Sequence, residues 1–104
     1  MPGHTHGVHA QPTTLGAQLL SWTIGLERDF ERFEAAYRHT NESPAGAAIM
    51  TGSPFAISRE RTAACLGFDR VMASTFDSIV GSRDYVLETY SAVAILDGHL
   101  GGWG

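Results

Sequence analysis

The feature that most constrains the fold is a row of large apolar side chains in the first half of the chain. The row recurs at steps of three, four, four, three and four residues, close to a heptad seam: Leu19, Trp22, Leu26, Phe30, Phe33 and Tyr37. With Thr13 or Thr14 as N-cap, it predicts a helix from about Thr14 to Arg38 or His39, roughly 35 Å long. Charged residues from Glu27 to Glu34 are assigned to its other faces. The pattern predicts an all-α fold.

A helix of this length and apolar content needs other helices beside it. The roughly 60 remaining residues can hardly supply them, because a small chain buries a limited fraction of its surface. We therefore expect packing against other chains or against further parts of the same protein. The alternative is a lone helical hairpin with frayed ends.

The rest of the chain reads as loops and two further helices. Residues 41–81 are expected to hold loops and a short helix from Ser58 to Gly67, with a helical turn near Ser74. Residues 82–100 are expected to form a second long helix, capped by the segment Ser82-Arg83-Asp84. Residues 101–104 read as a helix-breaking tail with a stray Trp103. Together with residues 1–12 and 13–40, these segments make one partial domain, 1–104.

Composition excludes several functions. The net charge is -4 and all seven basic residues are arginines, which argues against nucleic acid as a partner and excludes Schiff-base chemistry on lysine. No apolar run is long enough to span a membrane, and the N-terminus lacks a secretion signal, so a cytoplasmic location is expected. Cys65 is the single cysteine, and its apolar neighbours predict a buried side chain rather than a nucleophile.

The first twelve residues contain three histidines, two prolines and two glycines, a mixture expected to form neither regular helix nor strand. They present His4, His6 and His9 directly before the long helix. Three interpretations are open. In the first, the histidines bind a metal, although no cysteine or carboxylate accompanies them. In the second, they are incidental. In the third, one of them performs acid–base chemistry on a loop held by a rigid scaffold.

The third interpretation gains weight from a resemblance. The segments Met1-Pro2-Gly3-His4-Thr5-His6 and Ala10-Gln11-Pro12 resemble the second conserved region of argininosuccinate lyases, members of the fumarase/aspartase superfamily. That region reads Met-Pro-Gly-Tyr-Thr-His-Leu-Gln, one residue, then Ala-Gln-Pro. Similar residues continue colinearly through Arg59-Glu60-Arg61-Thr62-Ala63, Leu66-Gly67-Phe68, Arg83-Asp84 and Val86-Leu87-Glu88 to about Leu100.

The resemblance implies roles for individual residues. His6 matches the active-site histidine of proton transfer, and Thr5 matches a threonine that binds a substrate carboxylate. Arg83 and Ser74 match positions near the substrate, where Ser74 replaces an asparagine, and Gln11 is expected to fix the loop. The implied reaction is β-elimination of a dicarboxylate-type substrate with release of fumarate. It uses no metal or organic cofactor, in a homotetrameric helical bundle.

Two departures qualify the implied function. His4 replaces a tyrosine and Gly7-Val8 replaces Leu-Gln beside the active-site histidine, so the substrate need not be argininosuccinate. The family's first and third conserved regions match nothing in the 104 residues, so we expect part of a longer lyase, inactive alone. The alternatives are a non-catalytic helical oligomerisation module, another superfamily lyase such as an adenylosuccinate lyase, and a histidine-loop metal binder.

Overall fold

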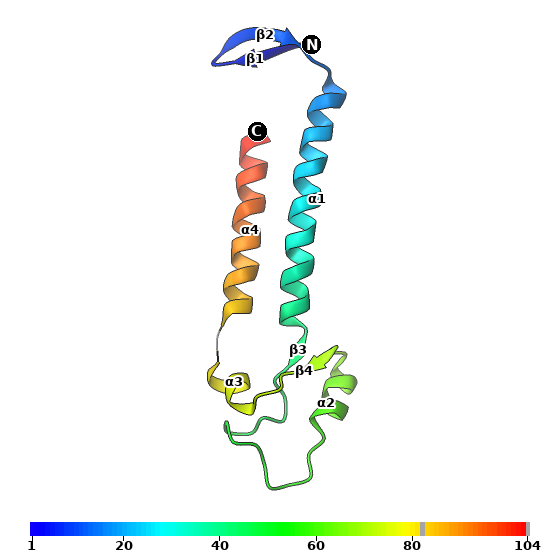
Figure 1. Cartoon of the computed structure of the whole chain (residues 1–104), viewed down its shortest axis with the longest axis vertical. Helices are drawn as coiled ribbons and strands as arrows, with labels where there is room; N and C mark the ends of the chain where they lie inside the picture. Colours follow the sequence, from blue (N-terminus) through cyan, green and yellow to red (C-terminus); the bar gives the residue numbers. More distant parts are fainter. Residues whose placement is uncertain (82, 104) are drawn as a thin grey trace.

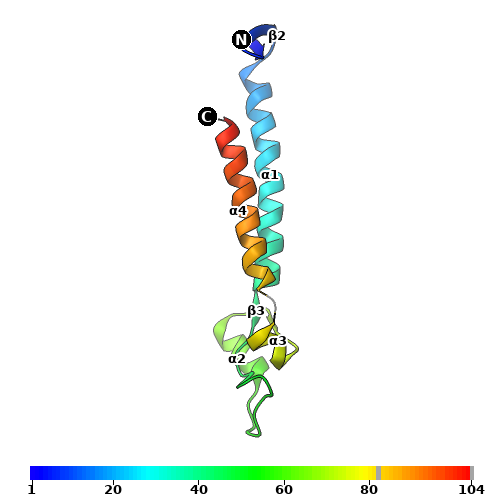
Figure 2. The same ribbon diagram turned by 90° about the vertical axis from the view of Figure 1, so that its left-hand side faces the viewer.

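Two long antiparallel helices form the body of the molecule. A computed structural model of the chain describes residues 1–81 and 83–103. The helices α1 (Leu15–Thr40) and α4 (Asp84–Trp103) lie side by side, as Figures 1 and 2 show from two directions. A small hairpin stands at one end and the short elements gather at the other, giving extents of 73 × 23 × 16 Å. No helix in the described ranges is long and apolar enough to cross a membrane.

Helix α1 begins and ends at capping residues. Thr14 is its N-cap, and the Thr14 hydroxyl accepts a hydrogen bond from the backbone N–H of Ala17 at 3.1 Å. Asn41 is its C-cap, and its backbone N–H donates to the carbonyl of Tyr37 at 2.9 Å. These caps satisfy backbone groups that the helix itself leaves unpaired. The extent of α1 agrees closely with the apolar row in the sequence.

The first twelve residues form a β-hairpin, so the prediction that they contain no regular strand is wrong. Strand β1 (Pro2–Thr5) pairs antiparallel with β2 (Val8–Pro12). The two prolines face each other at the open end of the hairpin, where ladder hydrogen bonds are least needed. A register shift between Pro2 and His4 accommodates Gly3, whose added Cβ would lie only 2.9 Å from the Gln11 carbonyl oxygen. The local amino-acid composition did not indicate that these two strands pair.

The other end of the molecule is built from short elements. Two two-residue strands, β3 (Glu42–Ser43) and β4 (Arg70–Val71), pair in parallel. Helix α2 (Arg59–Leu66) has Ser58 as N-cap and Gly67 as C-cap, and Gly67 has a left-handed φ of 81° that favours glycine. Helix α3 (Thr75–Val80) follows with Ser74 as N-cap. Cys65 on α2 is exposed in the structure of this chain, contrary to the expected burial.

Helix α4 continues further than the sequence suggested. It runs to Trp103 through the glycines at 98, 101 and 102, so the expectation that a helix-breaking tail begins at residue 101 is wrong; Gly104 lies outside the described residues. Trp103 is not a stray aromatic: its ring stacks on Trp22 of α1 with centroids 5.5 Å apart and lies against Gly25. This tertiary contact offsets the low helix propensity of glycine. The predicted cap residue Ser82 lies outside the described residues.

The buried part of the seam between α1 and α4 consists of small and polar residues, and of the large apolar row only Trp22 is seen to stack on a ring of α4. The buried residues of α1 are Gly25, Asp29 and Ala36, and the buried residue of α4 is Ala92. The sequence interpretation that placed Asp29 on an outer face is therefore wrong. Among the described residues, every buried apolar side chain is an alanine: Ala36, Ala47, Ala63 and Ala92.

Most of the large apolar residues of α1 lie outside this seam; Trp22, which stacks on Trp103, and Phe33 are half-buried. We call the exposed members the apolar stripe; Leu19, Leu26, Phe30 and Tyr37 are 45%, 43%, 66% and 66% exposed. Close approach of the two helices selects small side chains at the seam, and the long side chains occupy the neighbouring face. A single copy of this chain therefore leaves most of the large apolar side chains of α1 exposed.

Candidate functional site

The candidate active-site histidine lies at the tip of the hairpin. His6 and Gly7 form the two-residue turn between β1 and β2, with φ values of 53° and 74°. Positive φ at both positions is the geometry that matches the twist of a two-residue hairpin, and glycine at the second position adopts it without strain. His6 is exposed, and the turn holds it at a fixed point next to Thr5. A histidine presented in this way can exchange protons with a bound substrate.

The pairing of the strands separates the three N-terminal histidines. His4 and His9 face each other across the ladder, and their rings meet edge to face with centroids 4.7 Å apart. Thr5 pairs with Val8, so these two side chains point to the opposite face, because successive residues of a strand alternate. Within residues 1–81 and 83–103, no group of three or more histidine, cysteine or acidic side chains is placed to hold a metal ion.

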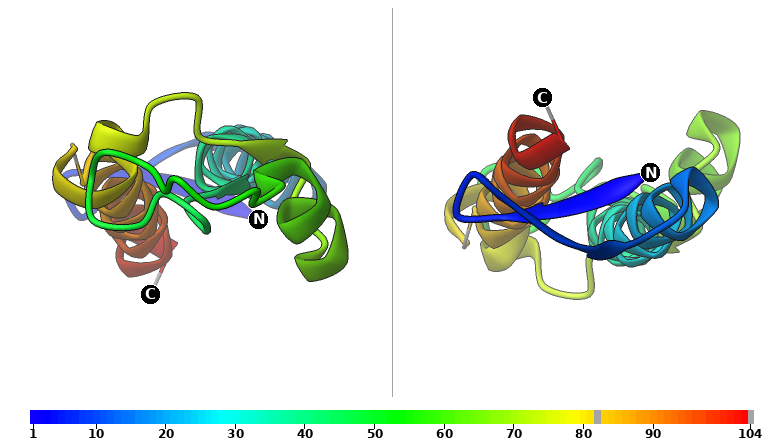
Figure 3. Two further views of the ribbon diagram at one scale, coloured as in Figure 1. Left: turned by 90° about the horizontal axis from the view of Figure 1, so that it is seen from below. Right: turned by 90° about the horizontal axis from the view of Figure 1, so that it is seen from above.

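The hairpin is attached to the start of α1 by two backbone contacts. The amino group of Met1 donates to the carbonyl of Thr13 at 2.9 Å, and the N–H of Thr13 donates to the carbonyl of Met1 at 2.9 Å. Seen along the helix axes in Figure 3, the hairpin extends across the end of α4. Gln11, expected to fix the loop, lies exposed in β2 and contributes its backbone carbonyl beside Gly3.

The other predicted site residues lie at the far end of the helix pair. Ser74 caps α3, and its hydroxyl accepts from the N–H of Asp77 at 3.1 Å. Arg83 directly precedes α4, and its carbonyl accepts from the N–H groups of Val86 and Leu87. Arg83 lines an open cavity of about 550 Å³. The cavity lies where α1 ends and α4 begins.

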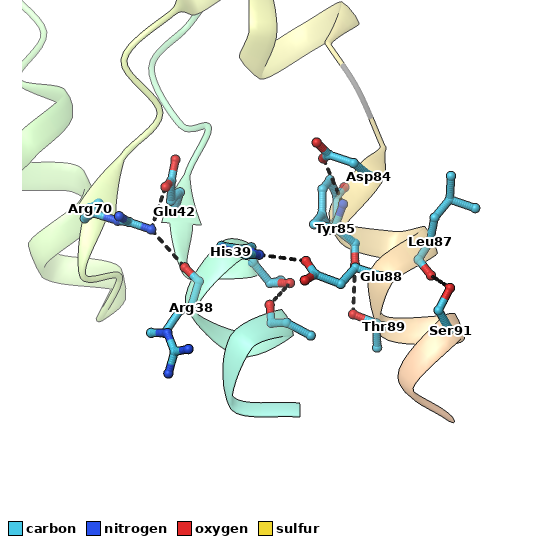
Figure 4. A network of polar contacts seen from close by, with 12 residues as sticks. Arg38, His39, Glu42, Arg70, Asp84, Tyr85, Leu87, Glu88, Thr89 and Ser91 are labelled. Carbon is cyan, nitrogen blue, oxygen red and sulfur yellow. Dashed lines mark hydrogen bonds and ion pairs between the residues drawn. The ribbon is translucent and has the colours of Figure 1, made fainter. Parts of the chain in front are cut away.

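Polar contacts tie this end together. His39 of α1 and Glu88 of α4 are 2.7 Å apart, and Arg70 pairs with Glu42 at 2.7 Å while donating to the carbonyl of Arg38 (Figure 4). The His39 side chain is 61% exposed, so this pair contributes little to stability. His39 and Glu42 also line the cavity, so both contacts lie at its wall.

The two sets of predicted residues do not meet within one chain. Thr5, His6 and Gln11 lie beyond the start of α1, whereas Ser74 and Arg83 lie beyond its end (Figure 1). The 26 residues of α1 separate them by about 39 Å at 1.5 Å per residue. A site that used both sets would have to combine different chains.

Comparison with known proteins places the chain in a family. The family model described as Lyase matches residues 1–104. This chain belongs to the lyase family. It is 47% identical over 102 residues to an argininosuccinate lyase of Haloarcula marismortui, and 52% identical over 94 residues to one of Halobacterium salinarum. These matches cover 98% and 90% of this chain but 20% and 19% of the relatives, so the chain spans about one fifth of their length.

Solved structures agree with this placement. EDDS lyase in complex with formate superposes with a TM-score of 0.89 at 32% identity, covering 96% of this chain and 20% of that one. A variant of EDDS lyase with bound fumarate gives a TM-score of 0.84 at 32% identity, covering 94% and 20%. The likeness confirms the all-α, fumarase/aspartase-type fold, to which the two small sheets are minor additions.

Proposed function

We propose that this chain is the part of an argininosuccinate lyase-type enzyme that carries its active-site histidine. The reaction is β-elimination: a proton leaves the carbon next to a carboxylate, the C–N bond breaks, and argininosuccinate yields arginine and fumarate. The observation that carries the proposal is His6 at the tip of a tight turn next to Thr5, on a chain whose relatives are argininosuccinate lyases. The proposal invokes no metal or organic cofactor and places the reaction in the cytoplasm.

Each proposed residue has a chemical task. The imidazole of His6 moves a proton during elimination, and the hydroxyl of Thr5 donates a hydrogen bond to a substrate carboxylate. Gln11 is proposed to position the hairpin. Arg83 and Ser74 are proposed to bind substrate in a site formed with another chain, since in their own chain they lie at the far end of α1. The guanidinium of Arg83 is suited to a carboxylate because it can donate two parallel hydrogen bonds.

The proposed partner is a second copy of the same chain, in a homotetramer of the whole enzyme. The exposed apolar stripe and the all-alanine core of the single chain support this, because burying large side chains between helices is the main source of stability of a helical bundle. The chain spans one fifth of its relatives, so we propose that the 104 residues alone have no lyase activity.

Complementation of a defective partner tests the proposal. The chain is refolded with a full-length argininosuccinate lyase of Haloarcula marismortui whose histidine at the position of His6 has been replaced. Fumarate release is then measured. We expect turnover to return with the unaltered chain and with His9→Asn, because position 9 faces away from Thr5. The His6→Asn chain should restore none.

Recovery of the chain with an affinity-tagged partner separates failure of assembly from failure of chemistry. Equal restoration by the His6→Asn chain would contradict the assigned role of His6. Co-assembly without any restored turnover by the unaltered chain would contradict the enzymatic proposal and favour a helical oligomerisation module.

A further inference from the structure

A polar cluster around one buried carboxylate joins the two long helices away from both sets of candidate site residues. Asp29 of α1 is 2% exposed, and its two carboxylate oxygens have different partners. One lies 2.6 Å from Nδ1 of His99 on α4, and the other accepts from Nη1 of Arg32 at 3.0 Å. We call these three residues the Asp29 cluster.

The cluster lies in register with the other contacts between the helices. Trp103 lies against Gly25, and His99 lies against Asp29. A step of four residues along α1 therefore corresponds to four residues back along α4. The same offset places Ala92 opposite Ala36, and both are buried. His39 and Glu88, at the far end, fit this register within one residue.

Apart from the cluster, two contacts mark the register at the ends of the seam: Trp103 against Gly25 and Trp22, and the exposed pair His39–Glu88. The other buried residues of the seam, Gly25, Ala36 and Ala92, are small. Sliding α4 by one heptad would bring Ala92 opposite Asp29 and Tyr85 opposite Ala36. Helical periodicity allows this alternative, because the same faces remain in contact.

The cluster penalises that alternative register. A buried carboxylate without a hydrogen-bonding partner is strongly unfavourable, since its lost hydration is not replaced. In the shifted register Asp29 would face an alanine methyl group and keep only Arg32. Polar residues in helix seams are known to select one register at some cost in stability.

We propose that the Asp29–His99 contact, supported by Arg32, sets the register of α4 on α1 rather than the stability of the helix pair. The proposal is independent of the proposed lyase function. It also assigns a role to the aromatic rings nearby. His99 stacks parallel to Trp103 with centroids 6.2 Å apart, and Trp103 stacks on Trp22, so the two tryptophans of the chain report on this register.

Disulfide trapping tests the proposal in the full 104-residue chain, with the exposed Cys65 replaced by serine. One pair of cysteines, Ala36→Cys with Ala92→Cys, closes in the observed register. A second pair, Ala36→Cys with Tyr85→Cys, closes in the register shifted by one heptad. Both pairs are oxidised in the unaltered background and in the Asp29→Leu/His99→Leu background.

With the cluster intact, we expect the first pair to close at least about tenfold faster than the second, a preference of about 1.4 kcal/mol. With the double leucine replacement, we expect the two rates to fall within about threefold of each other, while helicity and the melting midpoint stay equal or rise. The tryptophan exciton signal in near-UV circular dichroism should weaken in parallel. The matched control, Glu27→Leu/Asp97→Leu, removes exposed carboxylates from the same helices and should change neither ratio nor signal.

Three results would overturn the proposal. An unchanged preference in the double leucine background would show that the small residues set the register. Loss of helicity in that background would show that the cluster is needed for folding itself. Failure of the first pair to close in the unaltered background would show that the helices do not pair in this register.

Discussion

Replacement of Phe30 by serine should weaken self-association of the chain. Phe30 belongs to the apolar stripe and is 66% exposed in the single copy. A phenylalanine side chain buries about 200 Å² when fully covered, so an interface over this stripe would cover about 130 Å² more of it. At about 25 cal/mol per Å², that burial contributes about 3 kcal/mol for each copy. Both copies of a dimer carry the replacement, so the loss is about 6 kcal/mol and the dissociation constant of Phe30→Ser should rise by about four orders of magnitude.

The assay is light scattering after size exclusion over a series of chain concentrations. Phe55→Ser is the matched control: the same replacement at an 80% exposed phenylalanine in the loop before α2, remote from the apolar stripe. Serine and phenylalanine have similar helix propensities, so the change at position 30 removes apolar area with little effect on α1 itself. If both variants associate like the unaltered chain, or both weaken equally, the apolar stripe is not the associating surface and the reasoning fails.

Two further predictions concern the end of the molecule that carries the short elements. Gly67→Ala should destabilise α2 by about 1 kcal/mol, because φ at this position is 81°. A thermal melt followed by circular dichroism measures the change. Gly98→Ala is the control inside α4: its added Cβ would meet no atom within 4 Å, so this replacement should stabilise the chain. Arg59→Met should speed proteolytic cleavage between residues 44 and 57, because the guanidinium of Arg59 donates to the Ala45 carbonyl and to the Ser78 hydroxyl, at 3.2 Å each. If the control Arg61→Met is cleaved as fast as Arg59→Met, this account is contradicted.

Local sequence patterns predicted the helices well. The apolar row from Leu19 to Tyr37 anticipated α1 because helical periodicity is a local property. Ser58 and Gly67 marked the ends of α2 because capping depends on the backbone groups of a single turn. The same reasoning failed for the hairpin and for the end of α4. The hairpin depends on pairing between residues up to ten positions apart, and the glycine-rich end of α4 is held by Trp22 on another helix.

The candidate site was found partly from sequence and partly from structure. The motif around His6 identified the histidine, but only the hairpin showed that His4 and His9 pair on one face and leave His6 at the tip. The sequence brought Arg83 and Ser74 into the same hypothesis as Thr5. The structure separates them by the length of α1, which fits the proposed site shared between chains. Sequence reasoning also missed the Asp29 cluster, although Asp29, Arg32 and Ala36 repeat at heptad spacing.

The sequence by itself determined where the main helices begin, the family of the chain and the identity of its candidate histidine. Caps, helical periodicity and motifs depend on residues that are close together in the sequence. Only the tertiary structure decided which face of α1 meets α4. Large apolar side chains are expected to be buried. Two helices, however, approach most closely where their side chains are small, so Gly25, Ala36 and Ala92 form the buried seam. Asp29 is buried there because His99, 70 residues away in sequence, meets its carboxylate.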